Sequence, residues 1–287
     1  LRITQQELAY LVGLSRQRVN EALAALEQQG AIRIEYGGLR VLDLDCGHDT
    51  RFQPTAAMLD ALPSRPDALV VASPANPTGT VIDAAELARI ARWCEASGCL
   101  LISDEIYHRI EFGDAATFSA WQTNRQAVVL GSVSKYFSMT GYRLGWRLVD
   151  EPLRSRIDLL QGNLAICAPA LSQAAGCAAF GPDARAELDA HVRRYAANRD
   201  ILLERLPELG ITSFAPPDGA FYAWCDIGHL TDDSQAWCAG VLTATGVALA
   251  PGIDFDPVDG HRFMRLSFCG TPEEISDGID RLVRYLG

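Results

Sequence analysis

The spacing of apolar residues predicts a helical start to the chain. In residues 1–45, apolar positions at helical spacing follow a capping box at residues 4–7, and a second helical stripe follows Ser15. Gly30 ends that stripe, and apolar residues then alternate around Gly37-Gly38, which predicts a two-stranded wing. Two short helices joined by a glycine turn and followed by a hairpin predict a winged helix-turn-helix.

Apolar runs in the next part of the chain predict a parallel sheet. Residues 68–72, 99–103 and 128–130 form apolar runs typical of buried strands, and each run gives way to polar residues. A helix lies between the first two, capped by Asp83 with Glu86 three positions on. Strand, helix and strand, with polar side chains at each strand's carboxyl end, place ligands at the crevice of an open α/β sheet.

The pattern changes in the last part of the chain. A long helix at 183–205 leads to short strands near 221–225 and 264–268, a helix near 233–244, and a final helix capped by Thr271. This order is typical of a smaller α+β unit. We therefore predict three units, at residues 1–45, 46–182 and 183–287.

Composition narrows the class of protein. The 287 residues carry a net charge of −11, which argues against general affinity for nucleic acid or an anionic membrane. No apolar run approaches the roughly 18 residues needed to span a bilayer, and no signal peptide opens the sequence, so we expect a cytoplasmic protein. The cysteines and histidines show no metal-ligand spacing, so we expect no metal site.

One lysine stands out as a candidate nucleophile. Lys135 is the only lysine in the chain, and every other basic side chain apart from histidine is arginine. Arginine keeps its proton near neutral pH, whereas lysine loses it once burial or neighbouring cations lower its pKa. The alternative is a surface lysine that has survived in an arginine-rich chain.

Polar residues at the ends of the three predicted strands form a consistent set. They are Asn76, Asp104 with Tyr107, and Ser132 with Lys135 and Arg143. Each alone is compatible with a turn or a helix cap. Together they supply a carboxylate for a ring nitrogen, two hydrogen-bonding groups for a phenolate, a serine and an arginine for a phosphate, and one lysine. Pyridoxal phosphate needs these groups.

Five motifs in order resemble the fold-type I aminotransferases of class I and II. From residue 46 to 287 these are SPANPTGT, SDEIYH, SVSKYFSMTGYRLGW, DGAFY and RLSF. The resemblance implies an α/β large domain with a mostly parallel sheet and a small C-terminal α+β domain. It also implies a homodimeric enzyme with pyridoxal 5'-phosphate that transfers an amino group between an α-amino acid and a 2-oxo acid.

The resemblance assigns roles to individual residues. Lys135 would attach the cofactor and carry a proton, Asp104 would pair with the ring nitrogen, and Asn76 and Tyr107 would bind the ring oxygen. The phosphate would be held by Ser132 and Arg143, assisted by Ser134. Arg265 would bind the substrate carboxylate, Gly219 would let the backbone approach the substrate, and Phe221 and Tyr222 would lie nearby.

The same resemblance implies that part of the domain is replaced. A complete member has further residues before the strand at 68–72, which supply a phosphate-binding glycine turn, an aromatic that stacks on the ring, and two sheet strands. The winged helix-turn-helix stands in their place, so we expect an incomplete sheet with an exposed edge. We also expect impaired transfer by this chain.

The first 45 residues resemble a second family, the catabolite-activator (cAMP-receptor) DNA-binding domain. The segment LSRQRVN opens the second helix as in that family, which implies DNA contacts by Ser15, Arg16, Gln17 and Asn20. Acidic residues outnumber arginines in this stretch, so DNA binding would require dimerisation. Two alternatives to an enzyme therefore stay open: a DNA-binding regulator with an aminotransferase-like sensor domain, and an inactive fusion of two fragments.

Overall fold

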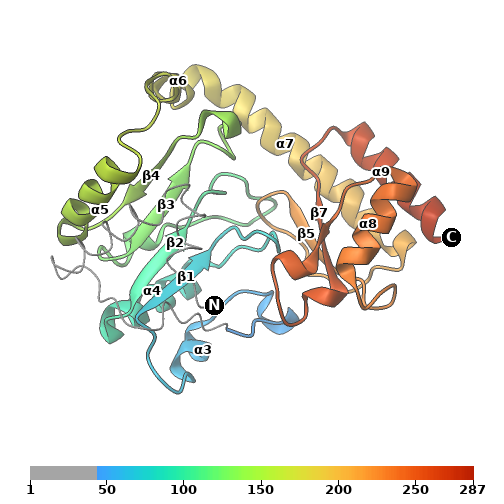
Figure 1. Ribbon diagram of the computed structural model, residues 1–287, viewed down its shortest axis with the longest axis horizontal. Coiled ribbons are helices and arrows are strands. Elements are labelled where there is room, and N and C mark those ends of the chain that lie inside the picture. Colours follow the sequence, from blue (N-terminus) through green and yellow to red (C-terminus); the bar gives the residue numbers. More distant parts are fainter. Residues whose placement is uncertain (1–43) are drawn as a thin grey trace.

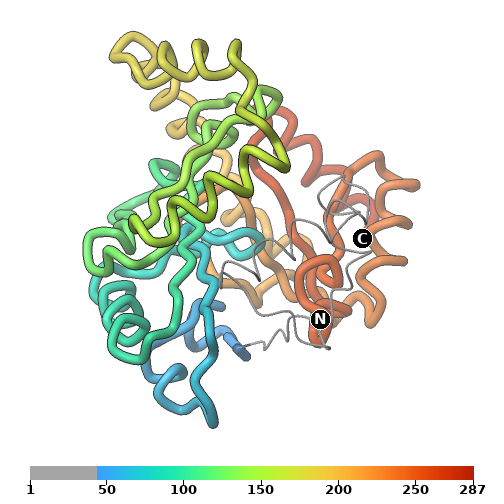
Figure 2. The backbone as a smooth tube through the Cα atoms, turned by 60° about the vertical axis from the view of Figure 1, so that its left-hand side comes forward, coloured from blue at the N-terminus to red at the C-terminus, as the bar shows by residue number. Residues whose placement is uncertain are grey.

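The computed structural model describes residues 44–287. The predicted winged helix-turn-helix and its candidate DNA contacts, Ser15, Arg16, Gln17 and Asn20, lie outside the described residues apart from the last two positions of the predicted unit. Within 44–287 the chain forms a four-stranded and a three-stranded sheet. Helix α7 (Pro182–Arg205) spans the top of Figure 1, from the side of the larger sheet to that of the smaller one. Figure 2 shows the same two parts from another side.

The larger sheet has the order β1-β2-β3-β4, in which the first three strands are parallel and β4 is antiparallel. The strands are β1 (Ala68–Ala72), β2 (Leu100–Asp104), β3 (Val128–Ser132) and β4 (Gly145–Leu148). The first three confirm the predicted strands within two residues at either end. The fourth was not predicted from the sequence, because all four of its residues are exposed and they form no apolar run.

The expectation that residues 68–72 form a fully buried strand is wrong on one face of the strand, where Ala68 and Val70 are exposed and Ala72 is half-buried. Leu69 and Val71 are buried, but the Val70 side chain is 67% exposed. Successive side chains of a strand point to opposite faces, so the described chain covers one face of β1 and leaves the other open at Val70. Strands β1 and β4 are the two edges of this sheet as the structure describes it.

Helix α4 (Ala84–Ser97) covers one face of the larger sheet, and α3 (Ala56–Asp60) packs against it. Asp83 caps α4 by accepting hydrogen bonds from the amides of Ala85 and Glu86, both at 2.9 Å. The helix confirms the predicted one, and its buried face consists of Leu87, Ile90, Ala91 and Cys94. These side chains form one core with the buried residues of β1, β2 and β3.

Two further helices follow β4 and lead into α7. They are α5 (Glu151–Leu164), which was not predicted, and α6 (Ala170–Ala179). Asp150 caps α5 by accepting a hydrogen bond from the Leu153 amide. None of the helices within residues 44–287 combines the length and the apolar character that crossing a membrane requires.

The smaller sheet is antiparallel, with the order β5-β7-β6. Its strands are β5 (Tyr222–Asp226), β6 (Ala250–Pro251) and β7 (Phe263–Ser267), and the helices packed around it are α7, α8 (Ser234–Thr245) and α9 (Pro272–Leu286). The predicted cap of α9 is confirmed, because Thr271 and Glu274 bond each other's backbone amides. The predicted boundary at residues 182 and 183 coincides with the start of α7 and stays a prediction.

A second core joins the two parts of the molecule. Its buried residues include Leu202 of α7, Met264 of β7 and Leu282 of α9. It also includes Tyr107 and Phe112, from the segment that follows β2 of the larger sheet. The chain after β2 therefore packs on the smaller sheet, and the polar ends of the larger sheet face it.

Gly79 fixes the distance between the two parts. Its carbonyl accepts hydrogen bonds from the amides of Asp218 and Gly219, at 2.9 and 2.8 Å. Its φ is +69°, and a Cβ there would lie 2.3 Å from the Tyr222 carbonyl oxygen. Only glycine allows this close approach in this conformation.

The Asp218 side chain reinforces the same junction. One carboxylate oxygen accepts a hydrogen bond from the Val81 amide, and the other pairs with the Arg51 guanidinium, both at 2.8 Å. Three segments that are far apart in the sequence are thereby joined at one carboxylate.

We expect Gly79→Ala to destabilise the protein far more than Gly113→Ala. Both glycines have a positive φ, but a Cβ at Gly113 meets nothing within 4 Å. The control should therefore cost about 1 kcal/mol for the left-handed conformation alone. Gly79→Ala should cost at least about 3 kcal/mol, because the added Cβ also forces two segments apart. Urea unfolding measures both values, and equal losses would contradict the role given to Gly79.

Candidate active site

Lys135 lies in the loop that follows β3 and points into an aromatic environment. Its Nζ lies 5.0 Å from the centroid of the Tyr107 ring and 5.8 Å from that of Phe221. Burial, and secondly the Arg265 guanidinium, lower the pKa of the Lys135 ammonium. The Asp104 carboxylate opposes this shift. Lys135 is therefore not a freely solvated surface lysine. At a given pH a larger fraction of its side chain is the neutral amine than in an ordinary lysine.

Asp104 is the last residue of β2, and its carboxylate lies close enough to Lys135 to interact with its charge. It accepts a hydrogen bond from the Ile106 amide at 3.1 Å. Burial raises the pKa of its carboxyl, whereas the Ile106 amide and the Lys135 ammonium act in the opposite direction. The charge of Asp104 therefore affects the pKa of Lys135, and the charge of Lys135 affects the pKa of Asp104.

Tyr107 is buried below Lys135, and its hydroxyl lies 3.0 Å from that of Tyr222. Burial, and secondly this hydrogen bond, raise the pKa of Tyr107 well above its ordinary value. Tyr107 therefore remains protonated and able to donate across the whole working pH range.

Arg265 links the two sheets at the site. It lies in β7 opposite Trp224 of β5, and its Nη1 donates a 2.8 Å hydrogen bond to Asn76 Oδ1. Its guanidinium carbon lies 4.3 Å from the Tyr222 ring centroid and 4.8 Å from that of Phe255. Its Nε is buried and has no hydrogen-bond partner among residues 44–287. A buried donor without a partner is costly, so this atom is ready to bind an acceptor.

The three residues that were predicted to bind a phosphate lie at the end of β3, where Ser132 is the last residue, and in the loop that follows it. Ser132 Oγ accepts a hydrogen bond from the Ser134 amide at 3.0 Å, and the Ser134 carbonyl accepts one from the Thr140 hydroxyl at 2.6 Å. Arg143 has a left-handed φ of 51°, and its Nη1 donates to the Thr140 carbonyl at 2.9 Å. Each predicted residue is thus hydrogen-bonded to another residue of the segment 132–143, and the Arg143 side chain is exposed.

The structure shows why position 219 requires glycine, and this reason could not be seen in the sequence. A Cβ at Gly219 would lie 2.6 Å from the Pro74 ring carbons, so glycine is required there for packing against the strand-end loop. Phe221 does lie beside the site, with its ring 5.5 Å from that of Tyr107. The substrate-binding roles of both residues stay predictions.

The resemblance placed Tyr222 of the DGAFY motif near the substrate and gave it no role of its own. Its hydroxyl bonds Tyr107 and its ring faces Arg265. The motif placed Tyr222 nearby, but no sequence signal indicates which hydroxyl it meets, because that partner lies in a distant segment.

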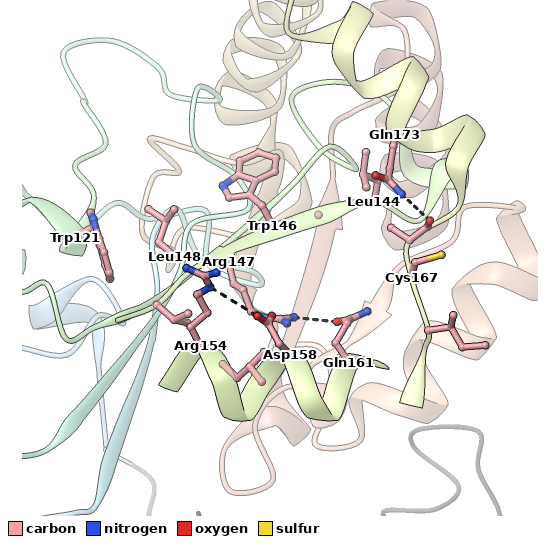
Figure 3. A pocket seen from close by; sticks show the side chains of 15 residues that line it. Trp121, Leu144, Trp146, Arg147, Leu148, Arg154, Asp158, Gln161, Cys167 and Gln173 are labelled. Carbon is pink, nitrogen blue, oxygen red and sulfur yellow. Dashed lines mark hydrogen bonds and ion pairs between the residues drawn. The ribbon is translucent and has the colours of Figure 1, made fainter. Parts of the chain in front are cut away.

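A separate hollow, away from the predicted site residues, lies between β4 and α5 (Figure 3). It has a volume of about 660 Å³, and its walls carry the Arg147–Gln161 hydrogen bond and the Arg154–Asp158 ion pair. Its lining includes none of the predicted site residues that the structure describes. The chemistry is therefore concentrated at the ends of the strands, where an amine, a carboxylate, phenols and guanidinium groups meet.

Comparison with known proteins agrees with both predicted resemblances. Residues 33–282 match the family "Aminotransferase class I and II", and residues 1–46 match the "Crp-like helix-turn-helix domain". A valine–pyruvate aminotransferase of Mycobacterium tuberculosis is 51% identical over 250 residues, which are 87% of this chain and 64% of the relative. The chain thus spans less than two thirds of that relative's length.

Solved structures confirm the predicted fold. An aminotransferase from Mycobacterium tuberculosis superposes with a TM-score of 0.84 at 51% identity, over 87% of this chain and 65% of that one. A Thermus thermophilus aspartate aminotransferase mutant gives a TM-score of 0.79 at 29% identity, with the same two shares. The arrangement is the fold-type I α/β architecture with a mostly parallel sheet. The chain belongs to the class I and II aminotransferase family.

Proposed function

We propose that this chain transfers an amino group between an α-amino acid and a 2-oxo acid, with pyridoxal 5'-phosphate as its cofactor. The observation that carries this proposal is the setting of Lys135. A lysine with a lowered pKa meets a buried carboxylate, a protonated phenol and a guanidinium at the ends of the strands. Valine and pyruvate are the first pair to test, because a relative at 51% identity is named for them.

The residues present fit this cofactor and an anionic substrate. The neutral amine of Lys135 suits condensation with an aldehyde, and Asp104 suits a protonated ring nitrogen. The buried Nε of Arg265 lacks an acceptor in the described part of the chain, and a carboxylate would provide one. When bound, pyridoxal phosphate supplies an electron sink for the substrate's α-carbon.

Each residue of the chain then has a defined task. Lys135 would hold the cofactor through its Nζ and, once the substrate's amino group has displaced it, the freed Nζ would carry a proton to and from the substrate α-carbon. Asp104 keeps the ring nitrogen protonated, whereas Asn76 and Tyr107 hydrogen-bond the ring oxygen. Arg265 binds and orients the substrate carboxylate.

The phosphate contacts come from the end of β3 and the loop after it. Ser132 and Ser134 donate hydrogen bonds, and Arg143 adds a charge-assisted contact once it turns from the Thr140 carbonyl. The expectation that transfer by this chain is impaired stays a prediction, as do its homodimeric state and cytoplasmic location.

Reduction with borohydride should trap pyridoxal phosphate on Lys135. We expect one adduct in a peptide map, and we expect it to disappear in Lys135→Arg, which keeps the charge but cannot lose its proton. Trapping only at the N-terminal amine, or none at all, would contradict the proposed function.

The reactivity of Lys135 without cofactor should depend on its two charged neighbours in opposite ways. Acetic anhydride reacts with neutral amines, so the pH profile of acetylation at Lys135 reports its pKa. We expect a value below the ordinary lysine value of about 10.4, because burial and Arg265 disfavour the ammonium. Arg265→Gln should raise this value, and Asp104→Asn should lower it further. Shifts of the same sign would refute this electrostatic account.

The match of residues 1–46 to a Crp-like helix-turn-helix domain supports DNA binding as a second function. We propose that Ser15, Arg16, Gln17 and Asn20 contact DNA. Selection from random duplexes should then enrich a palindromic site, and Arg16→Ala should weaken its binding at least tenfold, about 1.4 kcal/mol. Arg284→Ala, in the last turn of α9, is the control. Equal, sequence-independent binding by both variants would rule out this function.

A further inference from the structure

Tyr222 touches both halves of the proposed site. It is the first residue of β5 and is buried, with 7% of its surface exposed. Its hydroxyl lies 3.0 Å from the Tyr107 hydroxyl, and its ring centroid lies 4.3 Å from the Arg265 guanidinium carbon. One side chain thus contacts a residue proposed to bind the cofactor and the residue proposed to bind the substrate.

The hydroxyl of Tyr222 determines where the proton of Tyr107 can point. A phenol carries one proton and accepts hydrogen bonds at its oxygen. The raised pKa of Tyr107 corresponds to Tyr107 donating to Tyr222, the direction of the pair while no other acceptor is present. Once an acceptor outside the pair takes the Tyr107 proton, the bond reverses and Tyr222 donates to Tyr107. Hydrogen bonds in a chain also polarise one another, so Tyr107 becomes a stronger donor. Burial favours this effect, because little water competes for either hydroxyl.

The ring of Tyr222 determines how Arg265 is oriented. Tyr222 and Phe255 both present their rings within 5 Å of the Arg265 guanidinium carbon. Arginine prefers to stack its plane on aromatic faces. Asn76 holds one guanidinium nitrogen at 2.8 Å, and Nε is left buried without a partner among the residues that the structure describes. The rings therefore fix the plane of the guanidinium before a carboxylate arrives.

We propose that Tyr222 is a positioning residue for both ligands. Its hydroxyl directs the Tyr107 proton to the ring oxygen of the cofactor, and its ring holds Arg265 in the orientation that binds the substrate carboxylate. This inference rests on the proposed function. It adds that one side chain of the smaller sheet, Tyr222, orients both the residue that would bind the cofactor and the residue that would bind the substrate.

Three variants separate the two roles. Tyr222→Phe removes the hydroxyl and keeps the ring, whereas Phe255→Leu removes the other ring at Arg265 and leaves the hydroxyl pair intact. Tyr222→Leu removes both functions of Tyr222. Two quantities are measured on the full chain loaded with pyridoxal phosphate. They are the pH midpoint of the cofactor's absorbance change and the dissociation constant of 3-methylbutanoate, a carboxylate that cannot donate an amino group.

We expect Tyr222→Phe to raise the absorbance midpoint by about half a pH unit, because a weaker Tyr107 donor stabilises the ionised ring oxygen less. Its dissociation constant for 3-methylbutanoate should stay within about twofold. Phe255→Leu should leave the midpoint unchanged and weaken carboxylate binding by about fivefold, the size of a modest cation–π contact. Tyr222→Leu should show both effects.

The outcomes distinguish the inference from the function on which it rests. Failure of borohydride to trap the cofactor at Lys135 in the unsubstituted chain would refute both. Trapping at Lys135, with an unchanged midpoint in Tyr222→Phe or with both quantities altered together in that variant, would overturn the inference alone. Thermal unfolding is recorded for each variant, because a purely structural Tyr222 would lower the melting temperature without separating the two quantities. If Tyr222→Leu fails to fold, Tyr222→Phe still decides the role of the hydroxyl, and Tyr222→Met, which fills more of the space of the ring, replaces Tyr222→Leu as the test of the ring.

Discussion

The close backbone contact at Gly79 is the constraint on which the site depends. Its carbonyl bonds two successive amides at Asp218 and Gly219, and its Cα faces the Tyr222 carbonyl. The loop that carries Asn76 and the strand that begins with Tyr222 are therefore held at a fixed separation. Arg265 can bridge that separation with a single hydrogen bond because the backbone sets it. The geometry of the site is thus a consequence of main-chain packing.

Positive charge is in excess at the site, whereas the whole chain carries an excess of negative charge. The protein carries a net charge of −11, yet the charged groups that act on Lys135 include two guanidinium groups, Arg265 and Arg143, and one carboxylate, Asp104. Mutual repulsion between the cations, together with burial, disfavours the ammonium of Lys135. The same local excess of positive charge attracts phosphate and carboxylate groups. One arrangement thereby favours the neutral amine of Lys135 and attracts anions.

The strand ends could be predicted because an apolar run that stops at polar residues is a local signal. Contacts between distant segments carry no such signal. The sequence marked Gly219 for its approach to a substrate, whereas its lack of a Cβ is required by Pro74. It named Tyr222 only as a neighbour, because the Tyr107 hydroxyl that it meets lies far away in the chain. Strand β4 escaped prediction because its exposed residues lack the apolar pattern of a buried strand.

The core that joins the two parts of the molecule also has a consequence for folding. Tyr107 and Phe112 follow a strand of the larger sheet but are buried with Leu202 and Met264 around the smaller one. Neither part can lose its structure without exposing aromatic surface of the other, which couples their unfolding into one cooperative transition. A ligand bound at the strand ends therefore stabilises the helices around the smaller sheet as well. Slower proteolysis of α8 and α9 would therefore indicate that a ligand is bound at the strand ends, even though these helices lie in the smaller part of the molecule.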